Sequence, residues 1–212
     1  MKPEEMAQIL IGVIMLFIVS GVEYILLGQI DILVQVILFS FIVIFVGVFT
    51  KKWMAYMFDS SVEHKLWHVY RVGWREHQHF KKELPFGIIL PLVFSAFSLG
   101  AFKLMTFLTY ETKALKHRAA KRFGAYSFTE VTDWDNGLVG AAGIVGLLVL
   151  SIISYVLGYE LLFKMSAYYT LMNMIPISNL DGTQIFFGSR IVWSVLAVIS
   201  LIFGLYAFAL II

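Results

Sequence analysis

The sequence of 212 residues contains no cysteine. Disulfides, thiolate zinc sites and cysteine nucleophiles are therefore excluded. Charged residues are also scarce, at 14% of the chain, whereas 60% of the residues are hydrophobic and the mean hydropathy is +0.85. Soluble domains of this length are much more polar. The composition therefore predicts a multi-span helical membrane protein whose first partner is the lipid bilayer.

Apolar runs of about 20 residues, enough to cross a bilayer, recur along the chain and predict an all-α membrane protein with about six transmembrane helices. We expect the spans over 6–27, 32–50, 86–108, 137–157, 161–188 and 191–212. Pro91 should kink the third span, and the fifth must break near Pro176. The chain is accordingly divided into an N-terminal hairpin (1–50), a polar segment (51–85), a transmembrane core (86–190) and a C-terminal helix (191–212).

The long polar stretch at 51–84 mixes basic and aromatic residues. It carries seven Lys and Arg against four Asp and Glu, a net charge of +3, interleaved with Trp53, Trp67, Tyr70, Trp74 and Phe80. This mixture is typical of a helix lying in the headgroup region, and a loop packed over the helix ends is the alternative. No nucleic-acid-binding signature accompanies it, so no nucleic-acid partner is expected.

Two histidines of this stretch, His64 and His68, have the i, i+4 spacing that would place both rings on one helix face. Glu63 precedes the pair, which is not the H-E-x-x-H order of metalloproteases. A peripheral metal site is one interpretation, and solvated or interfacial histidines are the other.

A polar sequence interrupts the fifth apolar run at 173–182, N-M-I-P-I-S-N-L-D-G. Lipid cannot satisfy the backbone groups that a proline frees, so such a sequence is tolerated only where it packs in protein or lines a polar cavity. An ionisable side chain at this depth, here Asp181, marks a functional site. The pattern N-x-x-P-x-x-x-L-D-G resembles the intramembrane motif of the site-2 protease family, whose aspartate is the third zinc ligand.

The resemblance covers about 86–190 and implies a helix with an H-E-x-x-H motif ahead of a small-residue helix. In the family, an alanine and a glycine follow the second histidine by four and eight residues. Ala120 and Gly124 fit that spacing, and Ala142-Gly143 opens the small-residue helix. The chain itself is expected to continue helically over 111–123, where it becomes strongly basic.

In this register, H-E-x-x-H is replaced by T-K-A-L-K at 112–116, which lacks both imidazoles and the base. A lysine ammonium has no lone pair to offer a metal. Thr112, Lys113, Lys116 and Asp181 are therefore degenerate positions, and neither a catalytic residue nor a cofactor is predicted. We expect Lys113 or Lys116 to pair with Asp181. The alternative is that Asp181 caps the next helical segment.

The same motif has a second implication, because in active relatives the region around the asparagine also holds an extended substrate. Such binding needs only backbone partners and would survive loss of the metal. By this resemblance Asn173, Pro176, Asp181 and Gly182 would bind a substrate or a partner. The alternative is that Asn173 only satisfies backbone groups freed by Pro176.

Three functions are compatible with these patterns. The first is a non-catalytic site-2-protease-like protein, of a microbial plasma membrane, that binds or regulates a transmembrane protein. The second is an active intramembrane metalloprotease whose zinc is held by displaced ligands, drawn from the histidines of 64–79 and Asp181. The third is a small transporter or channel that uses Lys103, Lys113 and Asp181.

The expected spans place 51–84 and 109–136 on opposite sides of the membrane. Counting Lys and Arg then favours 51–84 in the cytoplasm, whereas the family resemblance favours 109–136 there. The hypothesis adopted from the resemblance is that 109–136 is cytoplasmic.

Overall fold

The computed structural model describes residues 2–71, 79–100, 102–115 and 131–210. Its helices are α1 (Pro3–Leu26), α2 (Ile30–Met57), α3 (Phe86–Phe97), α5 (Asp133–Val156), α6 (Glu160–Asn173), α7 (Asp181–Gly188) and α8 (Arg190–Ala209). Its strands are β1 (Ser60–Leu66), β2 (Val69–Arg71), β3 (His79–Leu84) and β4 (Leu108–Ala114). Within these ranges four helices, α1, α2, α5 and α8, are long and apolar enough to cross a membrane, which is consistent with a membrane protein. Of the about six predicted spans, the described ranges therefore support these four.

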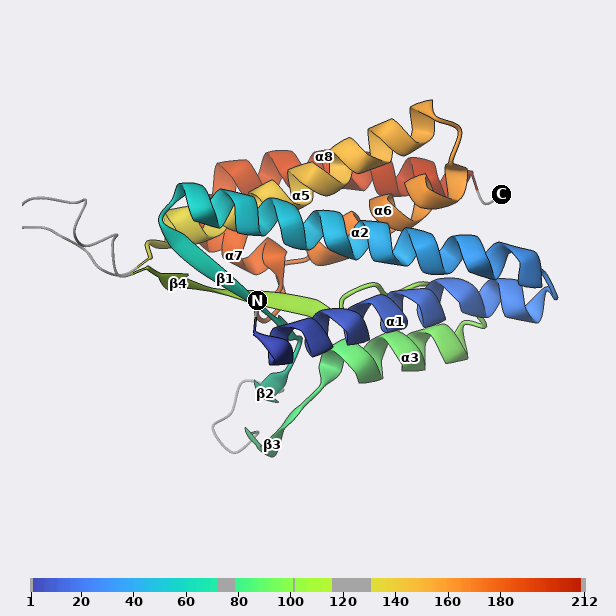
Figure 1. The fold of residues 1–212 in the computed structure, drawn as a ribbon, viewed down its shortest axis with the longest axis horizontal. Coiled ribbons are helices and arrows are strands. Elements are labelled where there is room, and N and C mark those ends of the chain that lie inside the picture. The colour runs from blue at the N-terminus through green and yellow to red at the C-terminus, as the bar shows by residue number, and fades with distance from the viewer. Residues whose placement is uncertain (1, 72–78, 101, 116–130, 211–212) are drawn as a thin grey trace, which may run out of the picture.

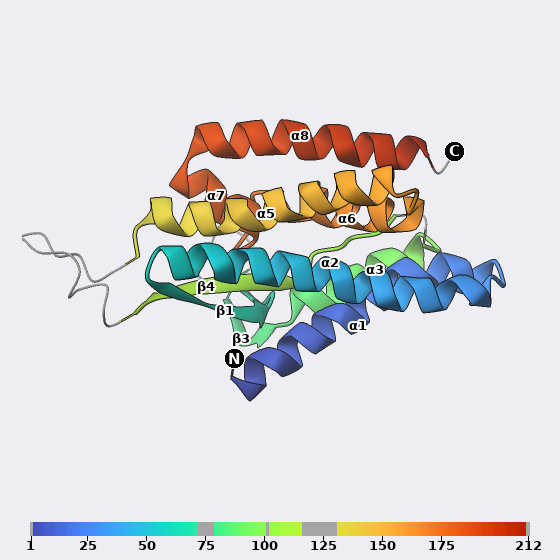
Figure 2. The ribbon, with the colours of Figure 1, turned by 45° about the horizontal axis from the view of Figure 1, so that its top comes forward.

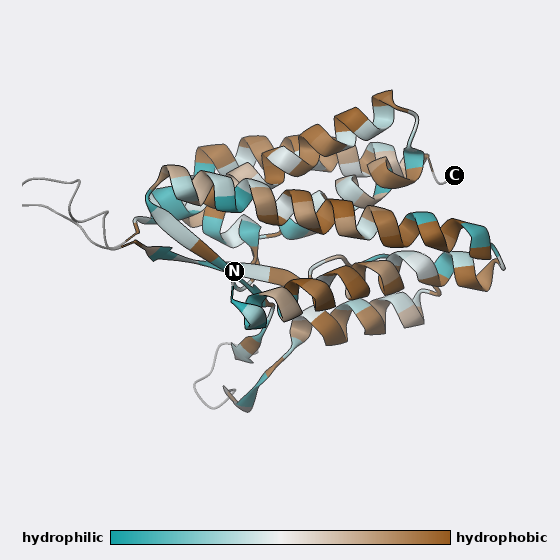
Figure 3. Cartoon of the chain, in the orientation of Figure 1, coloured by the Kyte–Doolittle hydropathy of each residue, from teal (hydrophilic) through white to brown (hydrophobic). Residues whose placement is uncertain are grey.

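The long helices lie side by side along the length of the molecule (Figure 1). In the turned view, α8 forms one outer layer and α5 and α6 the next (Figure 2), whereas Figure 1 shows α2 between these helices and the pair α1 and α3. The long helices consist mostly of hydrophobic residues, and hydrophilic residues gather around the strands and at the helix ends (Figure 3). This distribution suits helices surrounded by lipid.

The predicted span over 86–108 is wrong, because α3 ends at Phe97 after 12 residues. A helix of that length is about 18 Å long, whereas the hydrocarbon core of a bilayer is about 30 Å thick. The chain leaves the helix through two residues with positive φ, Leu99 and Gly100. Pro91 lies inside α3 and does not end it.

The residues after this turn run back through the centre of the protein in extended conformation. Met105, Phe107 and Tyr110 are at most 1% exposed, and the Phe107 carbonyl accepts a 2.9 Å hydrogen bond from the Trp67 N–H. The segment continues into β4, so the helix predicted over 111–123 is wrong for 111–114. Residues 116–123, with Ala120, lie outside the described residues.

Strand β4 pairs with β1 in antiparallel register, from Ser60↔Ala114 to Leu66↔Leu108. The prediction of an interfacial helix for 51–84 is therefore wrong, since α2 continues to Met57 and strands follow it. The pairing also places 60–66 and 108–114 side by side. The expectation that the two polar segments lie on opposite sides of the membrane is wrong for the same reason.

Small residues on α5 allow neighbouring helices to approach closely. A Cβ atom on Gly137 would lie 3.0 Å from Cα of Gly188, and one on Gly146 would lie 2.5 Å from Cγ2 of Thr50. Gly182 is more constrained, because its Cβ would lie 2.2 Å from the carbonyl oxygen of Met174. The glycine after Asp181 is thus required by backbone packing at the helix break.

We predict that Gly182→Ala lowers the free energy of unfolding by about 1–3 kcal/mol, as overpacking typically does, because a backbone carbonyl cannot rotate away as a side chain can. Gly47→Ala is the matched control, since its Cβ would meet Leu147 at an ordinary 3.7 Å. Thermal unfolding of both variants in detergent measures the difference. Equal melting temperatures for the two variants would contradict the packing assigned to Gly182.

Candidate functional site: a buried ion pair at the helix break

The helix predicted to break near Pro176 does so, which confirms that expectation. Helix α6 ends at Asn173 and α7 begins at Asp181. Pro176 is exposed in the connecting loop, in which Ser178 has a φ of 53°. The loop therefore turns the chain so that the first residue of α7 points its side chain into the protein, where Asp181 is buried.

Asp181 forms an ion pair with Lys51 of α2, with 2.5 Å between Nζ and Oδ2. The side chains are only 7% and 2% exposed. The predicted pairing with Lys113 is wrong, because Lys113 is exposed and bonds to Glu63 instead. Lys116 lies outside the described residues. The alternative role as a helix cap is also wrong, since no side-chain hydrogen bond caps α7.

Lys51 reaches Asp181 because its position on α2 and the shape of α5 both allow it. Along α2 it follows Ile44, Gly47 and Val48 on the buried face at helical spacing. A Cβ atom on Gly143 of α5 would lie 2.5 Å from Cε of Lys51. The small-residue stretch of α5 thus leaves room for the lysine stem.

The ammonium of Lys51 also lies 4.8 Å from the ring centroid of Tyr110, a cation–π contact. The Tyr110 hydroxyl donates a 2.8 Å hydrogen bond to the carbonyl oxygen of Asn136. Burial, and next the negative charge of Asp181, raises the pKa of Tyr110 well above its ordinary value. The phenol is therefore neutral, and its ring packs in a fixed position beside the ion pair.

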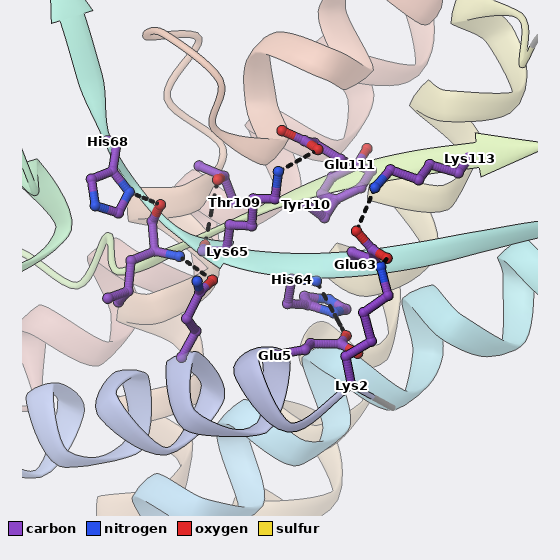
Figure 4. A network of polar contacts seen from close by, with 12 residues as sticks. Lys2, Glu5, Glu63, His64, Lys65, His68, Thr109, Tyr110, Glu111 and Lys113 are labelled. Carbon is purple, nitrogen blue, oxygen red and sulfur yellow. Dashed lines mark hydrogen bonds and ion pairs between the residues drawn. The ribbon is translucent and has the colours of Figure 1, made fainter. Parts of the chain in front are cut away.

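A second group of charges lies at the start of α1, where Glu5 faces His64 of β1 (Figure 4). Oε1 of Glu5 is 2.7 Å from Nζ of Lys52 and 3.3 Å from Nδ1 of His64, and it accepts the His64 backbone N–H at 3.2 Å. His64 is 1% exposed. With a neutral imidazole, the two carboxylates and two ammonium groups of this site balance.

Burial lowers the pKa of His64, and the hydrogen bond from its Nδ1 to the Glu5 carboxylate opposes this effect. The charges of Lys51 and Lys52 lower the pKa further, whereas Asp181 raises it. In the described part of the chain, Nε2 of His64 and Oδ1 of Asp181 are buried without a hydrogen-bond partner. Each such atom destabilises the folded state by about 1–3 kcal/mol. The packing around the site must therefore compensate for this loss.

No group of three His, Asp or Glu side chains that could hold a metal ion occurs within the described ranges. His64 and His68 do not share a helix face as predicted, because His64 lies in β1 and His68 follows its end. Nδ1 of His68 instead lies 2.8 Å from the carbonyl oxygen of Leu66. The two histidines therefore do not form a pair of metal ligands on one helix face, and His64 is buried instead of solvated.

Two amides, one on each side of the helix break, bind the extended segment described above. Nδ2 of Asn173 donates to the carbonyl oxygens of Met105 at 3.2 Å and Tyr169 at 2.7 Å. Nε2 of Gln184 donates to the carbonyl oxygen of Tyr110 at 2.9 Å. The extended chain beside the motif is thus the protein's own strand.

The other predicted site residues are dispersed. Thr112 is half-buried on β4 and donates a 2.9 Å hydrogen bond to Oδ1 of Asn136, away from the ion pair. Lys51, Glu5 and Gln184 were missed. The signal for Lys51 was available, because it continues the buried face of the second apolar run at i, i+3 and i+4 spacing.

No family model, curated protein or solved structure matches this chain. The resemblance to site-2 proteases therefore rests on the sequence alone: the motif at 173–182, the order of the helices expected before it, and the spacing of Ala120 and Gly124.

We predict that Asp181→Asn and Lys51→Met each destabilise the protein by about 3–5 kcal/mol, because each leaves the opposite charge buried without a partner. The double variant should be less destabilised than the sum of the two, which a double-mutant cycle of unfolding in detergent measures. Lys113→Met is the matched control and should show no coupling with Asp181→Asn. Strict additivity of Lys51→Met and Asp181→Asn would refute the assigned pair.

The lowered pKa of His64 makes stability depend on pH. The folded protein keeps His64 neutral below 6.5, the ordinary value, whereas the unfolded chain takes up the proton. The free energy of unfolding should therefore decrease as the pH falls from about 7.5 to 5.5. His64→Gln should flatten this part of the thermal-stability profile, and His68→Gln should leave it unchanged. Parallel profiles for wild type and His64→Gln would contradict the prediction.

Proposed function

We propose that this chain is a non-catalytic, site-2-protease-like protein of a microbial plasma membrane, that it crosses the membrane several times, and that it binds a transmembrane protein partner. The observation on which the proposal depends is the 2.5 Å ion pair between Lys51 and Asp181. In the family that the motif resembles, this aspartate would be a zinc ligand. Here its charge is balanced by an ammonium group, which cannot coordinate a metal.

The cost of replacing this ammonium by a metal also supports the proposal. A cation at Asp181 would have to displace Lys51 into a space bounded by Gly143 and the ring of Tyr110. A buried ammonium without its carboxylate is strongly destabilising. Zinc binding would therefore disrupt the packing between α2, α5 and α7.

The amides at the helix break already bind the protein's own chain beside β4. The partner would therefore bind along the edge of β1 that faces away from β4. The N–H groups of His64 and Leu66 on this edge are bonded to side chains of α1. Along a strand, residues whose backbone N–H and C=O face the paired strand alternate with residues whose groups face away from it. The N–H and C=O of Val62, two residues before His64, therefore also face away from β4. A cavity of about 500 Å³ lies there. It is lined by Lys2, Glu5, Lys52, Tyr56, Ser60, Ser61, Val62, Glu63 and Leu115.

This lining suits an extended juxtamembrane segment that carries both charges. Such a segment would add backbone hydrogen bonds at Val62 and salt links at Lys2 and Glu63. Glu63 is ionised over the whole physiological range, because Lys113 and then Lys2 lower its pKa to about 2. The groove therefore offers fixed charges of both signs to the partner.

The orientation follows from the basic residues. Lys2, Lys52, Lys65 and Lys113 lie around the paired strands, whereas Lys103 and Lys164 line a cavity with residues near the ends of α1 and α8. Positive-inside counting then places the strands toward the cytoplasm. The partner segment would accordingly be cytoplasmic.

Neither alternative gains support from a particular contact. A displaced zinc site would need a third ligand beside His64 and Asp181. A transport path would need its ionisable residues to line one route, but Lys103, Lys113 and Asp181 are each in a separate ion pair. The non-catalytic binding protein is therefore the function proposed.

Metal analysis of the purified protein tests the first half of the proposal. We expect less than one zinc per ten chains, and a melting temperature that 1,10-phenanthroline does not change. The measurement is elemental mass spectrometry after purification from zinc-supplemented cells. One tightly held zinc per chain that Asp181→Ala removes would overturn the proposal.

Site-specific photo-crosslinking in native membranes tests the second half. A photoreactive residue at Ser61, in the groove, should give an adduct of one defined mass. The same residue at Ser194, which is exposed on α8, is the control and should not give this adduct. Absence of the adduct at Ser61, or equal adducts at both positions, would contradict partner binding at this edge.

A further inference from the structure

A polar cavity of about 140 Å³ lies apart from the buried ion pair, where the final turns of α1 meet the first turns of α6 and the end of α8. The turn between α1 and α2, the turn between α5 and α6 and the C-terminal end of α8 lie together in this part of the molecule (Figure 1). The lining residues are Ser20, Glu23, Tyr24, Lys103, Met105, Leu161, Lys164, Met165, Tyr168 and Leu210. Two ammonium groups, two phenols and a hydroxyl thus converge on one small space between membrane-crossing helices.

The charges of this cavity do not balance. Lys103 lies 2.6 Å from Oε2 of Glu23, so these two neutralise each other. Lys164 donates its described hydrogen bond, of 3.0 Å, to the neutral carbonyl oxygen of Leu210. Within the described ranges no carboxylate lies within ion-pair distance of Lys164. The described residues that line the cavity therefore carry a net charge of +1.

The polar groups around Lys164 are suited to a phosphate. The hydroxyl of Ser20 is buried and has no hydrogen-bond partner among the described residues. The phenols of Tyr24 and Tyr168 line the same space. Hydroxyl and ammonium donors are the groups that bind phosphate oxygens. One singly charged phosphodiester would balance the charge and satisfy the Ser20 hydroxyl.

An apolar groove of about 180 Å³ adjoins the polar cavity and shares Lys103 and Tyr168 with it. Its other lining residues are Phe102, Leu171, Met172, Gly204, Leu205 and Phe208. A free phosphate would leave this groove unused, whereas the acyl chain of a phospholipid would fill it.

We propose that this cavity is a binding site for an anionic phospholipid. Its phosphodiester lies between Lys164, Lys103 and the Ser20 hydroxyl, and one acyl chain lies in the groove between α6 and α8. The site is independent of the ion pair at Asp181 and of the partner groove along β1.

The test is a titration of the delipidated full chain in detergent with dihexanoylphosphatidylglycerol, with the melting temperature as readout. Dihexanoylphosphatidylcholine and sodium phosphate are titrated in parallel. We expect the phosphatidylglycerol to raise the melting temperature, with the zwitterionic lipid at least about tenfold weaker, because its choline cation offsets the charge of the phosphodiester that both lipids carry. Lys164→Met should weaken the phosphatidylglycerol effect about tenfold. Lys164→Arg should retain it.

Lys65→Met is the matched control, because this lysine is paired with Glu111 near the strands. It should bind phosphatidylglycerol as the wild type does. Native mass spectrometry of the same samples counts the bound lipid and does not depend on the stability of a variant. Equal effects of the two lipids, or binding that Lys164→Met leaves unchanged, would overturn the proposal. Sodium phosphate acting at the same concentration as phosphatidylglycerol would also overturn it, because the site would then take free phosphate.

Discussion

The buried contact between the ammonium of Lys51 and the carboxylate of Asp181 determines how the centre of this protein is built. Two charges removed from water must be paired, so the C-terminal part of α2 and the first turn of α7 must meet. Their meeting requires a glycine on α5 at position 143 and a glycine after Asp181. Several small residues that have no side-chain chemistry of their own are thus explained by one ion pair.

The helix break has a second structural consequence, in the extended segment that precedes β4. A strand inside a helical membrane protein needs partners for its backbone groups on both edges. β1 supplies one edge, and the amides of Asn173 and Gln184 supply hydrogen bonds at the other. The polar residues at the break therefore stabilise the protein's own strand, and a binding partner has to use the opposite edge of β1.

Charges are distributed unevenly between the two ends of the molecule. Around the strands, most ammonium groups have a carboxylate within 2.7 Å, as Lys2 and Lys113 have in Glu63. At the other end Lys164 has a neutral carbonyl as its partner. The first arrangement is complete within the chain. The second is incomplete and suits an anion from the surrounding membrane.

The sequence by itself determined the membrane class, four long helices and the position of the helix break. Each of these follows from local properties: apolar runs of sufficient length, or a proline with polar neighbours. The strands at 60–66 and 108–114 and the choice of Lys51 over Lys113 were decided only by the tertiary structure. Which lysine becomes the buried partner depends on which helix face meets the carboxylate. That in turn depends on the packing between α2, α5 and α7, which are far apart in the chain.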